Sequence, residues 1–293
     1  MRATIAILLC LSLPQASLAW GEKGHVIVNR LAMEAAGDRL PPFMMNAADY
    51  IAYNSYEPDR WREETNSPMH AAQAPDHFFD SEYWGPITTI EADRYAFMSK
   101  LTERGIELAR VGYLPYAILE NYGRLRNAFR QWRNARNPEE REFAKANAVY
   151  YAGLLGHYVG DGSQPLHLSI HFNGWSESVA NPNNYSTDRG LHSRFEIAFV
   201  NMAVDSALVK PKVQSPQRLQ DVFASVKTYL AKTYSELQPL YELEKAGEFN
   251  PEAPRTKGKE FIASQLARSA TMLGDLWYTA WLESGVAPPA ARK

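Results

Sequence analysis

The fold class is decided by residues 142–161, which read EFAKANAVYYAGLLGHYVGD. Apolar or aromatic residues occupy most positions after Lys145, so a helix over this range has little polar face. A helix that is apolar on all sides runs through the interior of a protein rather than along its surface. The sequence therefore predicts a buried helix over 142–161.

Two further segments carry apolar residues at helical spacing. In 118–132 the apolar positions step by four, three, four and three, and a similar stripe over 261–280 stops before Gly285. Runs of alternating β-branched residues are nearly absent, and no Ser/Gly-rich linker or internal repeat divides the chain. We therefore expect an all-α fold in which residues 20–293 form a single mainly helical domain.

The first 19 residues have the features of an export signal. An apolar run over 5–13 follows Arg2 and precedes small residues that end at Ala19, which is the pattern that signal peptidase cleaves. We expect cleavage between Ala19 and Trp20 and a secreted or periplasmic protein; the alternative is a buried N-terminal helix. No apolar run reaches the roughly 20 residues that a membrane-spanning helix needs.

Composition and charge narrow the functional classes. A chain with 45% hydrophobic and 22% charged residues has a globular balance, which excludes disordered and collagen-like proteins. Loss of Arg2 with the signal would change the net charge from −2 to −3, so no general positive surface holds nucleic acid by its phosphates. Affinity for phosphate then requires a local feature, such as bound metal. The only cysteine, Cys10, lies in the signal, so packing or metal rather than disulfides stabilises the rest.

Within the predicted buried helix, His157 and Asp161 are four residues apart. They lie about 40 degrees apart around a helix of 3.6 residues per turn and therefore share one face. A carboxylate and an imidazole in an apolar helix are costly unless they pair or bind a cation. A structural pair and a metal site are equal alternatives here. His167 follows closely, just past the point where Pro165 ends the helix.

A second His–carboxylate pair with the same spacing favours a metal site over a structural pair. His192 and Glu196 are also four apart, in a segment whose apolar residues indicate another helix. Two helices that each present an imidazole and a carboxylate inward form a nitrogen and oxygen ligand set, which suits zinc. His77 and Asp59 add ligand types in the first third of the chain.

The expected new N-terminus supplies another ligand. Cleavage after Ala19 exposes the α-amine of Trp20, with His25 five positions further on. An amine with a reference pKa near 8 loses its proton to a metal at neutral pH and then acts as a ligand.

Together these residues resemble one known family. A Trp after a signal, the segment 155–167 (LGHYVGDGSQPLH) and the His192-x-x-x-Glu196 pair are similar to the superfamily of zinc-dependent phospholipases C and P-one and S-one type nucleases. The resemblance spans residues 20 to about 200. It implies an all-helical domain with three zinc ions at the base of a cleft.

The resemblance also implies a ligand set and a mechanism. Zinc lowers the pKa of water and neutralises phosphate, so phosphodiesters are the expected substrates. Asp59 is expected to orient or deprotonate the attacking water as well as to bind metal. The implied sets are Asp59, His77, His157 and Asp161 for one zinc, Trp20, His25 and Asp161 for a second, and His167, His192 and Glu196 for the third.

The motifs divide between two substrates. The short spacing from Trp20 to His25 is similar to the nucleases, whereas Glu196 and the Val28-Asn29-Arg30 segment are similar to the phospholipases. We expect a nuclease or nucleotidase acting on single-stranded DNA, RNA or nucleotides, with a phospholipase C acting on phospholipid as the alternative. A secreted, non-catalytic zinc-binding protein is the alternative of another class. No stable protein partner is implied.

One long irregular stretch, 172–190, is predicted to contact substrate. Loops longer than about 15 residues in compact domains are usually functional or disordered. Asn173, Trp175 and Tyr185 are the candidate contacts, because aromatic rings stack on bases or rest against acyl chains. The equal alternative is that Trp175 and Tyr185 fix the loop to the domain. His70 and His171 are assigned to the surface or to positions behind the ligands.

Overall fold

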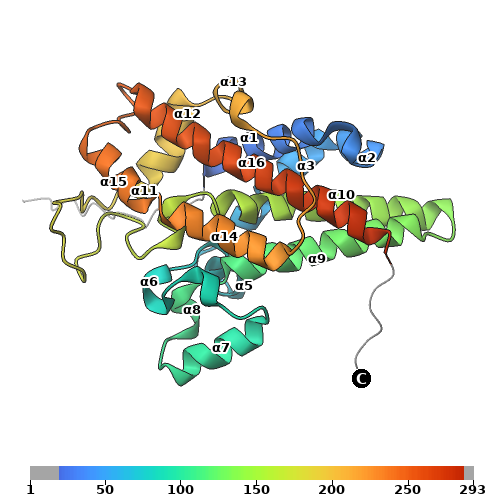
Figure 1. Cartoon of the computed structure of the whole chain (residues 1–293), viewed down its shortest axis with the longest axis horizontal. Coiled ribbons are helices and arrows are strands. Elements are labelled where there is room, and N and C mark those ends of the chain that lie inside the picture. The colour runs from blue at the N-terminus through green and yellow to red at the C-terminus, as the bar shows by residue number, and fades with distance from the viewer. Residues whose placement is uncertain (1–19, 287–293) are drawn as a thin grey trace, which may run out of the picture.

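The computed structural model describes residues 20–286 (Figure 1). In this range the regular elements are all helices or helical turns, and the single β contact is an isolated bridge between Phe172 and Gly174. The expected all-α fold class is therefore confirmed. The expected signal peptide, residues 1–19, lies outside the described residues.

Four long helices form the framework: α1 (Gly21–Ala36), α9 (Leu114–Arg133), α10 (Pro138–Asp161) and α16 (Thr256–Ser284). Helices α9 and α10 run antiparallel along most of their length, while α16 crosses them and also packs on α1 (Figure 1). The apolar stripes predicted over 118–132 and 261–280 fall inside α9 and α16, so both helix predictions are confirmed.

Local sequence fixes where α10 begins. Asn137 caps the helix, because its side chain accepts a hydrogen bond from the backbone N–H of Glu140 at 2.8 Å. Pro138 stands in the first turn, where its missing N–H costs nothing. From Ala152 to Asp161 every residue is buried, as the sequence predicts. The first half of α10 is less buried than the sequence predicts, since the side chain of Phe143 is 62% exposed.

Shorter helices surround this framework. Those between α1 and α9 include the group that lies below the framework in Figure 1. They are α2 (Pro42–Asn46), α3 (Ala48–Asn54), α4 (Glu57–Arg60), α5 (Pro68–Gln73), α6 (Ser81–Trp84), α7 (Arg94–Glu103) and α8 (Leu108–Val111). After α10 come α11 (Leu191–Ser193), α12 (Val200–Ala203), α13 (Ser206–Val209), α14 (Val222–Tyr234) and α15 (Leu237–Lys245).

Several single turns connect these helices. Three of them carry site residues: η2 (Ala74–His77) and η4 (Pro165–Leu168) are 3₁₀ turns, and η5 (Arg194–Phe199) is a π-helical turn between α11 and α12. The remaining 3₁₀ turns are η1 (Gly37–Arg39), η3 (Ile87–Thr89) and η6 (Lys210–Lys212).

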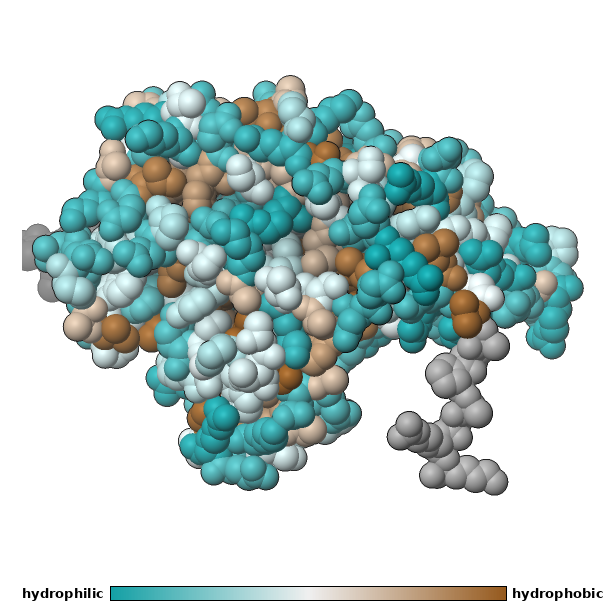
Figure 2. Space-filling model, viewed as in Figure 1, coloured by the Kyte–Doolittle hydropathy of each residue, from teal (hydrophilic) through white to brown (hydrophobic). Residues whose placement is uncertain are grey.

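The surface is mainly hydrophilic on the face drawn in Figure 2, where apolar residues form small, separate spots. Among the helices of residues 20–286, none combines the length and hydropathy that crossing a membrane requires.

Candidate metal centre

The buried end of α10 carries two of the expected ligands. His157 and Asp161 lie one turn apart on it, and both side chains are fully buried. His25 on α1 stacks on His157 with 4.2 Å between ring centroids. Gly160 permits this approach, since a Cβ there would lie 2.5 Å from Nδ1 of His25. The Nε2 atom of His25 is 3.6 Å from Oδ1 of Asp161.

Two residues from the first third of the chain complete this region. The Nδ1 atom of His77, on η2, lies 3.0 Å from Oδ2 of Asp161 and 3.0 Å from Nε2 of His157. Asp59, on α4, places Oδ1 3.7 Å from the same His77 nitrogen and 3.9 Å from Nε2 of His157. The structure therefore brings together ligands from α4, η2 and α10, which are far apart in the sequence.

The third group lies next to it. His167 on η4 and His192 on α11 face each other, with 3.1 Å between their Nε2 atoms. The Oε2 atom of Glu196 is 2.8 Å from Nε2 of His192. The segment carrying His192 and Glu196 is a short α-helical piece followed by the π-helical turn η5, rather than the regular helix expected. Wider turns of this type recur at functional sites.

Three groups in the described part of the chain meet the geometric requirement for a metal ion, because their ligand atoms lie within 4.8 Å of one another. Two nitrogens bound to a tetrahedral zinc at about 2.05 Å would lie about 3.3 Å apart, close to the separations above. The groups are His25, His157 and Asp161; Asp59, His77 and His157; and His167, His192 and Glu196.

Neighbouring groups orient these ligands. Nδ1–H of His157 donates to the carbonyl of Ser55 at 2.8 Å, and Nδ1–H of His167 donates to the carbonyl of His77 at 2.7 Å. Each bond leaves the Nε2 lone pair of that ring free to bind metal, which is the usual second-shell arrangement of metal-binding histidines. The side-chain amide of Gln164 donates to Oε2 of Glu196 at 3.2 Å.

Several ligand atoms have no hydrogen-bond partner. In residues 20–286, both ring nitrogens of His25, both carboxylate oxygens of Asp59, Oδ1 of Asp161 and Oε1 of Glu196 are buried without one. Burying such groups unsatisfied costs a few kcal/mol each. Bound cations would satisfy them, so the donor set fits metal better than a purely structural network.

The electrostatics support the same conclusion. Burial raises the pKa of the Asp59 and Asp161 carboxyls, against the opposing effect of nearby histidines. Burial also raises the pKa of Glu196 to about 7 and lowers the pKa of His192 to about 3. Burial therefore disfavours the charged forms of both groups, the carboxylate of Glu196 and the imidazolium of His192. A metal cation would stabilise the ionised carboxylates, and it would bind the imidazoles in the neutral form that burial already favours.

Trp20 lies against the same end of α10. Its indole is buried, and Nε1–H donates to the carbonyl of Gly160 at 2.9 Å and to Oγ of Ser163 at 2.8 Å. These bonds fix the start of α1 beside the helix end that carries Asp161. The expected use of the Trp20 amine as a ligand depends on cleavage before it and stays a prediction.

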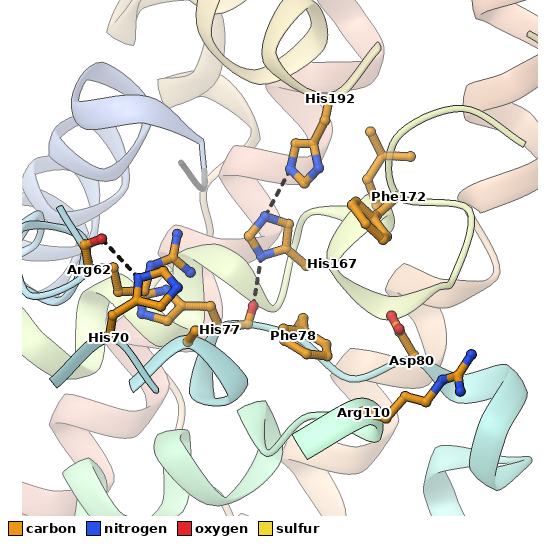
Figure 3. Close-up of a pocket in the computed structure, with 11 residues that line it drawn as sticks. Arg62, His70, His77, Phe78, Asp80, Arg110, His167, Phe172 and His192 are labelled. Atoms are coloured by element: carbon orange, nitrogen blue, oxygen red, sulfur yellow. Dashed lines mark hydrogen bonds between the residues drawn. The ribbon is translucent and has the colours of Figure 1, made fainter. Parts of the chain in front are cut away.

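A cavity of about 270 Å³ opens beside the metal-binding groups. Figure 3 shows His77, His167 and His192 on one side of it and Asp80 with Arg110 on the other, with Phe78 and Phe172 between them.

Sequence reasoning did not single out several wall residues of this cavity, although part of the signal was present. Phe78 and Asp80 closely follow the ligand His77, and Arg62 follows the ligand Asp59 by three residues. The Nη2 atom of Arg62 lies 3.3 Å from Oδ1 of Asp59. Arg110 carried no such signal, because it enters the cavity from the distant helix α8. His70 also lines the cavity, with Nδ1–H donating to the carbonyl of Arg62 at 2.9 Å.

The expected substrate contacts of the 172–190 loop, which are Asn173, Trp175 and Tyr185, do not line this cavity. Trp175 stacks on His171 with 3.8 Å between centroids, and Tyr185 is buried against Trp175 and Tyr241. This packing favours the alternative in which both aromatic residues fix the loop to the domain. Asn173 accepts a hydrogen bond from the backbone N–H of His192 at 3.3 Å, so it supports a ligand.

Comparison with protein-family models finds no match for this chain, and comparison with curated proteins finds none either. The function of the protein must therefore be inferred from its own residues and their geometry.

Proposed function

We propose that this protein is a secreted, zinc-dependent phosphodiester hydrolase of the nuclease or nucleotidase type. The observation that carries the proposal is the convergence of three buried groups of histidine and carboxylate ligands on one side of a cavity. Zinc fits because every ligand atom is nitrogen or oxygen and several nitrogens are about 3 Å apart. When bound, zinc supplies a water of lowered pKa and neutralises phosphate charge.

Asp59 and Arg62 have distinct tasks in this proposal. The Asp59 carboxylate lies next to the metal-binding nitrogens, with Oδ1 paired to Nη2 of Arg62 at 3.3 Å and Oδ2 without a hydrogen-bond partner, so it can orient a water at the metal centre and take up its proton. The Arg62 guanidinium lines the cavity beside it and favours the negative charge that develops on the phosphate.

The rest of the cavity favours a nucleotide. Phe78 and Phe172 can receive a flat base between them, since aromatic stacking holds bases of any sequence. Burial raises the pKa of Asp80 to about 8, so at neutral pH its carboxyl both donates and accepts hydrogen bonds, as the edge of a base requires. The positive charge of Arg110 in the same wall disfavours the quaternary ammonium of a choline phospholipid.

The test is a substrate panel on the chain that begins at Trp20, with its zinc content measured. Single-stranded DNA, RNA, bis-p-nitrophenyl phosphate and a phosphatidylcholine dispersion are assayed side by side. We expect turnover of the nucleic acids and of the small diester. Hydrolysis of phosphatidylcholine without nucleic acid would assign the phospholipase alternative. Bound zinc without any hydrolysis would assign the non-catalytic alternative.

A variant separates catalysis from metal binding. Asp59→Asn keeps the size of the side chain and removes the carboxylate, while His167, His192 and Glu196 remain unaltered. We expect this variant to retain zinc in that third group and to hydrolyse bis-p-nitrophenyl phosphate at least about 100-fold more slowly, since general acid–base groups contribute 10²–10⁴-fold. Wild-type activity in Asp59→Asn would contradict the role given to Asp59.

A further inference from the structure

We propose that Arg110 binds a second phosphate of the substrate, the phosphate next along the chain from the one at the metal centre. The inference rests on the proposed function and adds that the enzyme prefers substrates with a flanking phosphate. Arg110 lines the cavity on the side opposite the histidines, with Phe78 and Phe172 between (Figure 3). A nucleotide held at the metal centre would extend its chain toward it.

The guanidinium of Arg110 is held in place without being neutralised. It lies over the ring of Tyr83 with 4.7 Å to the centroid. The helix that carries it is fixed to the cavity wall, because the backbone N–H of Asp80 donates to the carbonyl of Val111 at 2.7 Å. No carboxylate of residues 20–286 lies within 4 Å of its nitrogens as a salt-bridge partner.

Two acidic residues of the neighbouring segment, Asp80 and Glu82, form no salt bridge with Arg110. Burial raises the pKa of Asp80 to about 8 against the opposing effect of the positive charge of Arg110, so this carboxyl is mainly protonated at pH 7. The carboxylate of Glu82 has other partners than Arg110. It accepts hydrogen bonds from Oγ of Ser169, from the N–H of Ile170 and from the hydroxyl of Tyr234. A positioned cation without an ion-pair partner at the edge of a substrate cavity is an anion-binding element.

The guanidinium of Arg110 is better suited to bind a phosphate than the edge of a base. Arg110 is solvent-exposed, and the phosphates of a bound single strand remain at the surface while its bases are enclosed. The planar guanidinium offers paired N–H donors that match two phosphate oxygens. Asp80, which is buried deeper in the wall, is placed to contact the base instead.

The experiment compares two substrates that differ by one phosphate. Wild-type protein is given a thymidine dinucleotide with a single phosphate and a thymidine trinucleotide with two. We expect kcat/KM per phosphodiester bond to be about threefold higher for the trinucleotide, the size of one exposed charge contact. In Arg110→Gln this ratio per bond falls to about one. The dependence of log(kcat/KM) for the trinucleotide on log salt becomes less steep by about 0.7. Arg110→Lys retains part of the preference.

A matched control is available at the residue that follows the neighbouring helix α7. Arg104 also lies over an aromatic ring, that of Trp84 at 3.7 Å, but it does not line the cavity. Arg104→Gln removes the same charge from the same region, and we expect it to leave the ratio and the zinc content at their wild-type values.

The outcomes separate this inference from the proposed function. If wild-type protein hydrolyses neither thymidine substrate, the proposed function fails, and the same preference is then measured by calorimetry as a ratio of dissociation constants. Equal ratios in wild type and Arg110→Gln overturn the inference even when both substrates are hydrolysed. A loss that occurs with guanine-containing substrates but not with thymidine would assign Arg110 to base recognition and also overturn it.

Discussion

Oδ2 of Asp161 lies 3.0 Å from Nδ1 of His77, although the two residues are 84 positions apart. The other carboxylate oxygen, Oδ1, faces His25 at 3.6 Å. One carboxylate therefore has an oxygen near a residue of each of two neighbouring groups, which would allow Asp161 to contribute to both.

Asp161→Asn should accordingly remove more metal than a single-site ligand would. We expect more than one zinc equivalent to be lost and the phosphodiesterase rate to fall at least about 100-fold, since removing even an outer-shell partner costs 10–100-fold. Metal analysis and a diester assay measure this. Asp275→Asn is the control, because it is a partly buried acid with a raised pKa of about 6 that lies outside the ligand groups. Full metal content in Asp161→Asn would contradict the bridging role.

The second prediction concerns the start of the mature chain. A chain that begins at Trp20 offers an α-amine, whereas one that retains Ala19 offers an amide nitrogen, which is a poor zinc ligand. We expect the longer chain to fold, to keep the zinc of His167, His192 and Glu196, and to lose about one zinc and most of its activity. Zinc content and rate are compared for the two chains. Equal values in both would refute the amine as a ligand.

Removal of metal should lower thermal stability. Each bound ion stabilises the folded state by its binding free energy, and the ligand atoms left behind are buried without partners. We expect Tm to fall by more than about 10 °C on chelation, since 1 kcal/mol shifts Tm by about 2–4 °C in a chain of this size. Calorimetry with and without chelator measures it, and zinc rather than magnesium should restore Tm. An unchanged Tm would speak against buried coordination.

Asp80 should make stability depend on pH. Its pKa is raised from 3.8 to about 8 by burial, so between these values the unfolded chain has released the proton and the folded chain keeps it. Stability from this group is therefore lost as pH rises from about 4 to about 8. Asp80→Asn carries no such proton, so its Tm should rise relative to wild type between about pH 5 and pH 8. A Tm difference that stays constant over this range would contradict the raised pKa.

Phe172 should matter for nucleotides more than for small diesters. It is 44% exposed at the cavity wall, so Phe172→Ala removes a stacking surface at little cost in packing. We expect KM for a dinucleotide to rise about tenfold, because stacking of one base contributes about 1–3 kcal/mol. The rise for bis-p-nitrophenyl phosphate should be smaller. Phe143→Ala, exposed on α10 away from the cavity, serves as the control, and an equal effect in both variants would rule out stacking at Phe172.

Much of the site could be predicted because helical spacing is a local property. The four-residue steps from His157 to Asp161 and from His192 to Glu196 place each pair on one face whatever the rest of the chain does. The apolar sequence around the first pair likewise required burial, and burial of such groups required partners. These short-range rules predicted the fold class, the long helices and two pairs of candidate metal ligands without any knowledge of the tertiary structure.

Tertiary packing decided which of these faces meet and what surrounds them. Helical spacing does not predict that the turn with His77 packs against α10. It also does not predict that Arg110 on α8 lines the same cavity as Phe172. It also could not show that the rings of Trp175 and Tyr185 pack against Tyr241. The sequence determined which side chains can bind a metal and which of them share a helix face, because side-chain type and helical spacing depend on the sequence alone. The cavity beside the ligands depends on contacts between distant segments, and those form only when the helices pack.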